Sequence, residues 1–283
     1  MAKPSNIRKV SVGSDHTNIL VYGTPGSGKS YLAGTSPKAL ILEGGPGETK
    51  SIASAKFNVD VWEMNNRSDL LEAYEYMRHE GCKEYEWLWL DSISMLEGRL
   101  MEDQLEEAHA SNNKRSLLVP SMPDYQIVQN TVDQYTKWFC KLPINFGMTA
   151  HVMIQAIKEL DEDGDEVDRL SYLPQVQGGQ GKLSQKICGY FDIVGYFDVE
   201  QKGKELLRSL MFQGDNTHVA KDRYGVLADD RGRMVSPTIP KISGLVAKAM
   251  GSEKPKPMKA TGATKKGVAK KATSASKATA ARR

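Results

Sequence analysis

The sequence predicts an α/β protein in which a mostly parallel central sheet is flanked by helices. Short apolar runs alternate with helical stretches over the first 155 of its 283 residues, and strands in such alternation form a parallel sheet with helices on both faces. A glycine-rich segment joins the first apolar run to the first helix. After Gln155 strand patterns follow one another directly, which predicts an antiparallel C-terminal extension.

The elements of the parallel part follow from the spacing of apolar residues. Buried strands are predicted for Asn18–Tyr22, Ala39–Leu42, Val59–Met64, Glu86–Asp91 and Phe146–Gln155. Helices are predicted from Lys29 to Gly34, from a cap at Ser68 to His79, from Ile93 to Ala110, and from Pro123 to Leu142. The glycines and the proline of Gly44–Lys50 predict a loop.

The C-terminal part is predicted to begin with a hairpin, in which Val152–Glu159 and Val167–Tyr172 flank a polar turn. The turn carries Asp161, Asp163 and Asp165. Its glycine does not stand where a calcium-binding loop needs one, so a polar hairpin turn is favoured over a calcium site. Two further strands and a helix are predicted at Asp192–Glu200, Leu206–Gln213 and Pro240–Met250.

Composition and charge divide the chain into three parts. We predict a flexible leader at 1–17, a folded domain at 18–250, and a disordered Lys-rich tail at 251–283 that has no aromatic residue. The net charge of +3 conceals an asymmetry, because the tail carries ten cations against one acid while residues 1–250 carry a net charge of −6. Such an arm favours a polyanionic partner; a solubilising tail is the alternative.

Several classes of protein are disfavoured. No stretch approaches the ~20 apolar residues needed to cross a bilayer, so no membrane partner is expected. The N-terminus lacks the apolar segment of a secretory signal. Cys82, Cys140 and Cys188 lie far apart, which argues against a zinc site and a disulfide scaffold and favours a cytoplasmic location.

The glycine-rich segment matches a phosphate-binding motif, G-x-x-x-x-G-K-[ST], at every fixed position. Its residues are Gly23, Thr24, Pro25, Gly26, Ser27, Gly28, Lys29 and Ser30. The glycines let backbone N–H groups point at phosphate oxygens, and the following helix offers its positive end to the same anion. Lys29 is expected to contact the β- and γ-phosphates and Ser30 to ligate Mg²⁺, and Tyr31 completes the predicted nucleotide-binding set. The sequence therefore predicts binding of ATP with Mg²⁺.

Two acidic residues are candidates for the remaining chemistry. Asp91 ends an apolar strand and is expected to hold Mg²⁺ through water, with a helix-capping role as the alternative. The next residue is Ser92 rather than the glutamate that many ATPases place there, so the group that orients the attacking water must come from elsewhere. Glu43, which ends the strand after the motif helix, is the candidate. Anchoring of a loop is its alternative role.

The ordered set of these pieces resembles the RecA-like class, and more narrowly the phage-encoded minimal RecA-like ATPases of single-strand annealing and recombination. The matching segments are Ile19–Ser30, Leu40–Gly45, Leu88–Ser92, Met148–His151 and Val219–Gly225. The resemblance spans about 20–230. It implies a RecA-like P-loop NTPase core with ATPase activity that single-stranded DNA stimulates.

The resemblance also implies roles for later residues. His151 ends the strand that follows Asp91 in the chain and would sense the γ-phosphate; an ordinary strand-end histidine is the alternative. Lys221 and Arg223 would reach the ATP of a neighbouring subunit and neutralise charge on its γ-phosphoryl group, with a solvated charged turn as the alternative. A trans role implies a homo-oligomer, either a ring or a filament.

Single-stranded DNA is the expected partner, and a single-strand binding protein is a further candidate. RecA-like proteins bind DNA through two loops, which correspond here to about 109–122 and 158–182. Amides, glycines and scattered cations in these segments suit a site that follows the DNA backbone, although plain surface loops are an equal alternative. Three other functions stay open: an accessory ATPase that loads or regulates a helicase or recombinase, a nucleotide-dependent switch with negligible turnover, and a small-molecule kinase.

Overall fold

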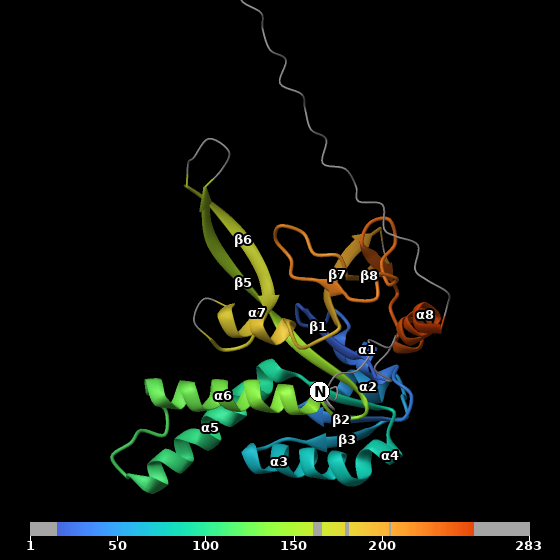
Figure 1. Cartoon of the computed structure of the whole chain (residues 1–283). Helices are drawn as coiled ribbons and strands as arrows, with labels where there is room; N and C mark the ends of the chain where they lie inside the picture. The colour runs from blue at the N-terminus through green and yellow to red at the C-terminus, as the bar shows by residue number, and fades with distance from the viewer. Residues whose placement is uncertain (1–15, 161–165, 179–180, 204, 252–283) are drawn as a thin grey trace, which may run out of the picture. The chain divides into compact units, whose positions relative to one another are not determined.

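The computed structural model describes residues 16–160, 166–178, 181–203 and 205–251 (Figure 1). Most of the predicted leader and nearly all of the predicted tail lie outside the described residues, as do the three aspartates of the hairpin turn. The predictions for those segments therefore stay predictions.

A single mixed sheet forms the centre of the described part, with the strand order β10-β8-β7-β1-β5-β4-β2-β3. The parallel strands are β1 (Asn18–Gly23), β2 (Ala39–Glu43), β3 (Asp60–Glu63), β4 (Trp87–Asp91), β5 (Asn145–Leu160) and β7 (Ile193–Lys202). The antiparallel strands are β6 (Glu166–Pro174), β8 (Glu205–Met211), β9 (Lys221–Asp222) and β10 (Arg233–Val235). The predicted fold class is confirmed: the sheet is mostly parallel and its antiparallel strands come late in the chain.

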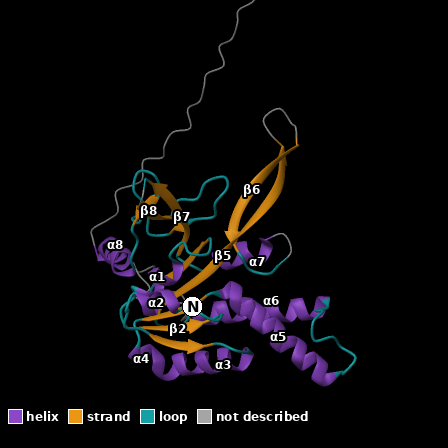
Figure 2. Ribbon diagram, turned by 180° about the vertical axis from the view of Figure 1, so that it is seen from behind, coloured by secondary structure: helices purple, strands orange, loops and turns teal. Residues whose placement is uncertain are grey.

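Helices pack on both faces of the sheet (Figure 2). Alternate strand residues point to opposite faces, so Leu20 and Tyr22 belong to one apolar core while Ile19 and Val21 belong to the other. The first core packs against α3 (Arg67–Tyr76), α5 (Ile93–Ser111), α6 (Met122–Phe139) and α7 (Lys182–Cys188). The second packs against α1 (Lys29–Gly34), α2 (Lys50–Ser54) and α8 (Ile239–Gly251). The π-helix η1 (Met77–Gly81) and α4 (Cys82–Glu84) extend α3.

Strand β5 belongs to two structures at once. Residues 145–151 lie in the sheet between β1 and β4. Residues 152–160 pair with β6 as an antiparallel hairpin that projects away from the sheet in Figures 1 and 2. The predicted hairpin is therefore present, and it continues directly from a central strand.

Several local details differ from the sequence prediction, among them the short strands β9 and β10 and the π-helix η1, which were not predicted. Helix α3 is capped by Asn66, whose side chain accepts a hydrogen bond from the backbone of Asp69 at 3.0 Å, so the predicted cap at Ser68 is wrong. The predicted loop Gly44–Lys50 ends in the short helix α2. Helix α7 was not predicted from the sequence.

Candidate active site

The phosphate-binding motif forms the turn between β1 and α1, as its sequence predicts. Gly26 and Gly28 adopt φ angles of +77° and +113°, which favour glycine. Lys29 is buried, and its Nζ donates hydrogen bonds to the carbonyl oxygens of Gly23 at 3.0 Å and Thr24 at 2.9 Å. Burial lowers its pKa, and the nearby carboxylates oppose this effect. The backbone carbonyls thus hold the lysine inside the loop that would surround the phosphates.

Asp91 lies at the end of β4 with a side chain suited to a cation. The Thr149 hydroxyl donates a hydrogen bond to its Oδ1. Its Oδ2 is buried and has no hydrogen-bond partner among the described residues. Burial and the charge of Glu48 raise the pKa of Asp91 to about 6, while Thr149, Ser30 and Lys29 lower it. The Ser30 hydroxyl lies near enough to lower the pKa of Asp91, and no hydrogen bond joins it to Oδ2.

This donor set fits Mg²⁺, which prefers oxygen ligands and keeps several of its waters. An orphaned, buried carboxylate oxygen is costly unless a positive charge or a donor meets it. Ser30 would ligate the ion and Asp91 would hold it through water. When bound, Mg²⁺ would neutralise charge on the phosphate oxygens.

A pocket of about 840 Å³ surrounds the start of α1. Of the predicted nucleotide-binding residues, Gly26, Gly28, Lys29, Ser30 and Tyr31 line it, and Gly23, Thr24, Pro25 and Ser27 do not. One wall comes from the loop after β2 and from α2, and the other from β7, β8 and the segment before α8. The volume falls within the ~300–1,000 Å³ typical of small-molecule sites.

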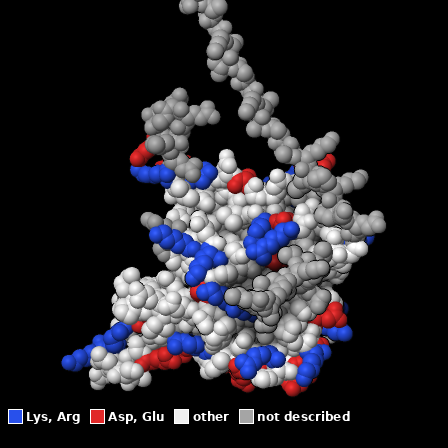
Figure 3. Space-filling model, viewed as in Figure 1, with Lys and Arg blue, Asp and Glu red and all other residues white. Residues whose placement is uncertain are grey.

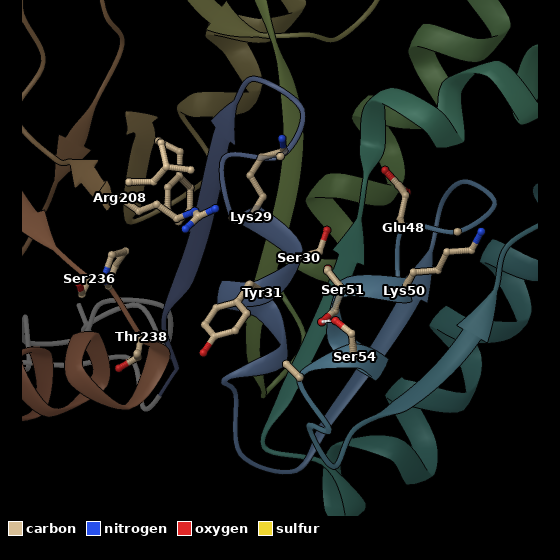
Figure 4. A pocket seen from close by; sticks show the side chains of 17 residues that line it. Lys29, Ser30, Tyr31, Glu48, Lys50, Ser51, Ser54, Arg208, Ser236 and Thr238 are labelled. Carbon is tan, nitrogen blue, oxygen red and sulfur yellow. Dashed lines mark hydrogen bonds between the residues drawn. The ribbon is translucent and has the colours of Figure 1, made fainter. Parts of the chain in front are cut away.

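Arg208 is a pocket residue that the sequence did not single out. It lies on β8, and Figure 4 shows it on the opposite side of α1 from Glu48. A Cβ on Gly28 would lie 3.2 Å from Arg208 Cδ and 3.7 Å from Phe197 Cε1, so the arginine stem covers the phosphate-binding turn. Tyr31, on the same side, packs edge-on against Phe57 with 5.0 Å between ring centroids. A lone arginine in a predicted strand carries no sequence signal for such a contact.

Glu43 and Glu48 lie in the same loop region but make different contacts. Glu43 Oε1 accepts hydrogen bonds from the backbone N–H of Thr49 at 3.1 Å and from its hydroxyl at 2.9 Å. Glu48 contacts Ser92 instead: Oε2 accepts from the Ser92 N–H and Oε1 from its hydroxyl, both at 2.6 Å. The predicted base therefore anchors the residue before α2, and a second carboxylate lies beside the cation site. The role of Glu43 in hydrolysis stays a prediction.

His151 lies beside the motif, because it pairs in register with Gly23. Strand β5 continues past it to Leu160, so the expectation that His151 ends its strand is wrong. Burial and the charge of Lys29 lower its pKa. Its backbone N–H donates to the Ser94 hydroxyl at 2.9 Å, and that hydroxyl donates to the carbonyl of Gln175 at 2.7 Å. Its position suits the predicted sensor of the γ-phosphate, and that role stays a prediction.

Helix α5 connects this region to the loop after β6. Both oxygens of the buried Glu97 accept the backbone N–H of Gln177, at 2.9 and 3.0 Å. Burial raises the pKa of Glu97 to about 8. Because Ser92 caps α5 and Ser94 lies in its first turn, one short stretch of chain contacts both the predicted cation site and the loop at residues 175–178.

Lys221 and Arg223 are engaged within their own chain. Lys221 Nζ donates to the carbonyl of Cys188 at 2.7 Å, and Arg223 donates to Asp192 Oδ1 at 2.9 Å and to the carbonyl of Gly189 at 3.0 Å. Strand β9 pairs with the beginning of β7, whereas the phosphate-binding motif follows the end of β1. The pair therefore does not reach the phosphate site of its own subunit, and a trans role stays a prediction.

The two predicted DNA segments are partly described. The first is the connection between α5 and α6. The second covers the outer part of the hairpin and the loop after it, and its Gly178 and Lys182 line a polar pocket of about 660 Å³. The other lining residues lie outside the predicted segment, on α6 and α7: Gln129, Asn130, Asp133, Leu183 and Lys186. Lys186 pairs with Asp133 at 3.0 Å. On the face of the molecule that Figure 3 shows, basic side chains lie near the middle, close to the position of α7 in Figure 1.

Comparison of the chain with known proteins identifies one matching family and a similar solved structure. A family model described as an AAA domain matches residues 15–224. A crystal structure of a KaiC-like protein from the hyperthermophilic archaeon Pyrococcus horikoshii OT3 is similar, with 15% identity, a TM-score of 0.39, and coverage of 78% of this chain and 89% of that chain. No curated protein matches the sequence. None of the helices in the described residues has the length and apolar character needed to span a bilayer.

Proposed function

The chain belongs to the AAA-domain family of P-loop ATPases, and from this premise we propose that it hydrolyses ATP and acts on single-stranded DNA in recombination or annealing. Lys29 binds the β- and γ-phosphates, and Ser30 and Asp91 hold Mg²⁺. His151 senses the γ-phosphate, and Lys221 and Arg223 act on the ATP of a neighbouring subunit in a homo-oligomer. The roles of Lys29, Ser30 and Asp91 rest on the pocket around the motif and on the orphaned oxygen of Asp91. The roles of His151, Lys221 and Arg223 rest on the resemblance to RecA-like proteins.

One observation carries the link to DNA. The segment from Ser92 to Glu97 contacts Glu48 at one end and the backbone of Gln175 and Gln177 at the other. The second contact region adjoins the polar pocket that contains Lys182 and Lys186. Lysines and amides in a groove bind a phosphate backbone without reading sequence. Nucleotide-dependent movement of this segment would therefore change the DNA-binding loop.

The test compares ATP hydrolysis by the full chain with and without single-stranded oligothymidylate. We expect DNA to raise the rate, and we expect Lys29→Ala to abolish turnover. The double variant Lys182→Ala/Lys186→Ala should lose DNA stimulation, whereas Lys83→Ala, which removes an exposed lysine from α4, should retain it. Stimulation should also fall with salt, since phosphate contacts release counterions.

An accessory ATPase is the second candidate, and one observation favours it. Asp133 pairs with both Lys137 and Lys186, so part of the positive charge at the polar pocket is already neutralised. Hydrolysis that is indifferent to DNA, together with no binding of oligothymidylate at low salt, would reject the direct DNA role. That result would leave an ATPase that acts on a protein partner.

A further inference from the structure

The loop after β2 returns to the end of β4 through two close glycine contacts. Glu43 pairs in register with Asp91, so the loop starts beside the cation site. A Cβ on Gly44 would lie 2.3 Å from the Ser92 carbonyl oxygen, and one on Gly45 would lie 2.6 Å from Met95 Cβ. Contacts this short exclude any side chain. The two glycines therefore let the loop backbone lie directly against the residues that follow Asp91.

This path brings the carboxylate of Glu48 to Ser92. Gly47, with a φ of +82°, lies just before Glu48 in this loop. Both oxygens of Glu48 then accept hydrogen bonds of 2.6 Å, one from the backbone and one from the hydroxyl of Ser92. Two short bonds from one residue fix the orientation of a carboxylate, since charge-assisted hydrogen bonds are the stronger kind.

Glu48 also lies near the residues that would bind the nucleotide. It lines the same pocket as Lys29 and Ser30, and its charge influences both Asp91 and Lys29. Glu43 differs, because it does not line this pocket and its Oε1 accepts both hydrogen bonds from Thr49, the residue before α2. Many ATPases carry a glutamate directly after the metal-binding aspartate. Here Ser92 stands at that position and holds a glutamate from another loop.

We propose that Glu48, oriented by Ser92, is the general base of ATP hydrolysis. The oxygen of a water forms a bond to the γ-phosphorus, and the bond from that phosphorus to the β–γ bridging oxygen breaks, leaving its electron pair on ADP. The carboxylate of Glu48 accepts the proton that the water loses and releases it to solvent, so the products are ADP and inorganic phosphate. Ser92 is a positioning residue. The proposal rests on the ATPase part of the proposed function and not on its DNA part.

The experiment measures steady-state hydrolysis without DNA, and separately the affinity for a fluorescent ATP analogue. General-base catalysis contributes ~10²–10⁴-fold, so Glu48→Gln should lower kcat at least ~100-fold and retain binding of the analogue. Its loss of kcat should exceed that of Glu43→Gln by at least ~10-fold. Glu102→Gln, which neutralises an exposed glutamate on α5, is the matched control and should hydrolyse ATP normally.

Ser92 is tested by its effect on pH dependence. Burial raises the pKa of Glu48, and the hydrogen bonds from Ser92 lower it. In Ser92→Ala the rising limb of kcat should therefore move to higher pH, and Ser92→Thr should move it back because it restores the hydroxyl. A purely structural role would lower kcat without this movement.

The outcomes distinguish the assignment of Glu48 as the base from the proposed ATPase and DNA functions. Near-normal turnover in Glu48→Gln, or a greater loss in Glu43→Gln than in Glu48→Gln, would overturn the assignment while the ATPase stands. Loss of turnover in Glu48→Gln in a protein that DNA fails to stimulate would support the assignment and reject the DNA role. A wild-type chain that binds the analogue and does not hydrolyse ATP would overturn both.

Discussion

The buried carboxyl of Glu97 predicts a specific pH dependence of stability. Its carboxylate faces the backbone N–H of Gln177, and burial raises its pKa from 4.5 to about 8. A carboxyl whose pKa is raised by folding binds its proton more tightly in the folded state. The free energy of unfolding therefore falls as pH rises from 4.5 to about 8 and is constant outside this window.

The magnitude follows from the width of the window. Each pH unit corresponds to about 1.4 kcal/mol, so the full interval from 4.5 to about 8 gives an upper limit of about 5 kcal/mol. Glu97→Gln removes the titration and keeps a carbonyl oxygen that can accept the Gln177 N–H. The assay is urea unfolding of both proteins at pH 5, 6, 7 and 8. As pH rises, the free energy of unfolding of wild type should fall relative to that of Glu97→Gln by about 1.4 kcal/mol per pH unit. If the two proteins show the same dependence of this free energy on pH, the reasoning is refuted.

Three further predictions concern the pocket. Arg208→Ala should raise the KM for ATP ~10-fold, because a hydrogen bond to a charged group contributes about 1.5–3 kcal/mol. The control Arg231→Ala removes an exposed arginine paired with Asp229 and should leave KM unchanged. Equal KM values for Arg208→Ala and wild type would exclude a contact between Arg208 and the nucleotide. Asp91→Asn should abolish Mg²⁺-dependent hydrolysis. It should also stabilise the apo-protein at pH 7 by up to about 3 kcal/mol, since burial raises the pKa of Asp91 from 3.8 to about 6. Thermal unfolding of Asp91→Asn at a lower temperature than wild type would contradict this. Gly44→Ala should displace the loop from Ser92 and reduce kcat, since its Cβ would lie 2.3 Å from a backbone oxygen; kcat equal to wild type would show that the loop path is unimportant.

Features encoded by local sequence were predictable, and those created by tertiary contact were not. The glycine-rich turn and the buried strands that precede Glu43 and Asp91 follow from short-range patterns, and the structure contains them. The contact of Glu48 with Ser92 joins residues 44 positions apart and depends on the close approach of the Gly44 backbone. Periodicity carries no information about such an approach. From the sequence alone, Glu43 at the end of β2 is the predicted base, and its role in hydrolysis stays a prediction.

Dependence on tertiary structure also explains why the sequence did not predict the position of Arg208 or the cap of α3. Arg208 reaches the phosphate-binding turn only because β8 returns antiparallel beside β7. At α3, Asn66 and Ser68 are both good capping residues, and the choice depends on which of them adopts extended backbone; Asn66 does. The trans role of Lys221 and Arg223 depends on a second subunit and stays a prediction.

Strand β5 gives the hairpin a direct mechanical connection to the nucleotide site. Residues 145–151 lie between the strand that leads into the phosphate-binding turn and the strand that ends in Asp91, and the next residues form one arm of the hairpin. Thr149, which donates to Asp91, lies three residues before the hairpin begins. An extended strand transmits tension along its backbone without an intervening hinge. A force applied to the hairpin by a bound partner would therefore act on the residues that orient Asp91, and a change at Asp91 would act on the hairpin in return.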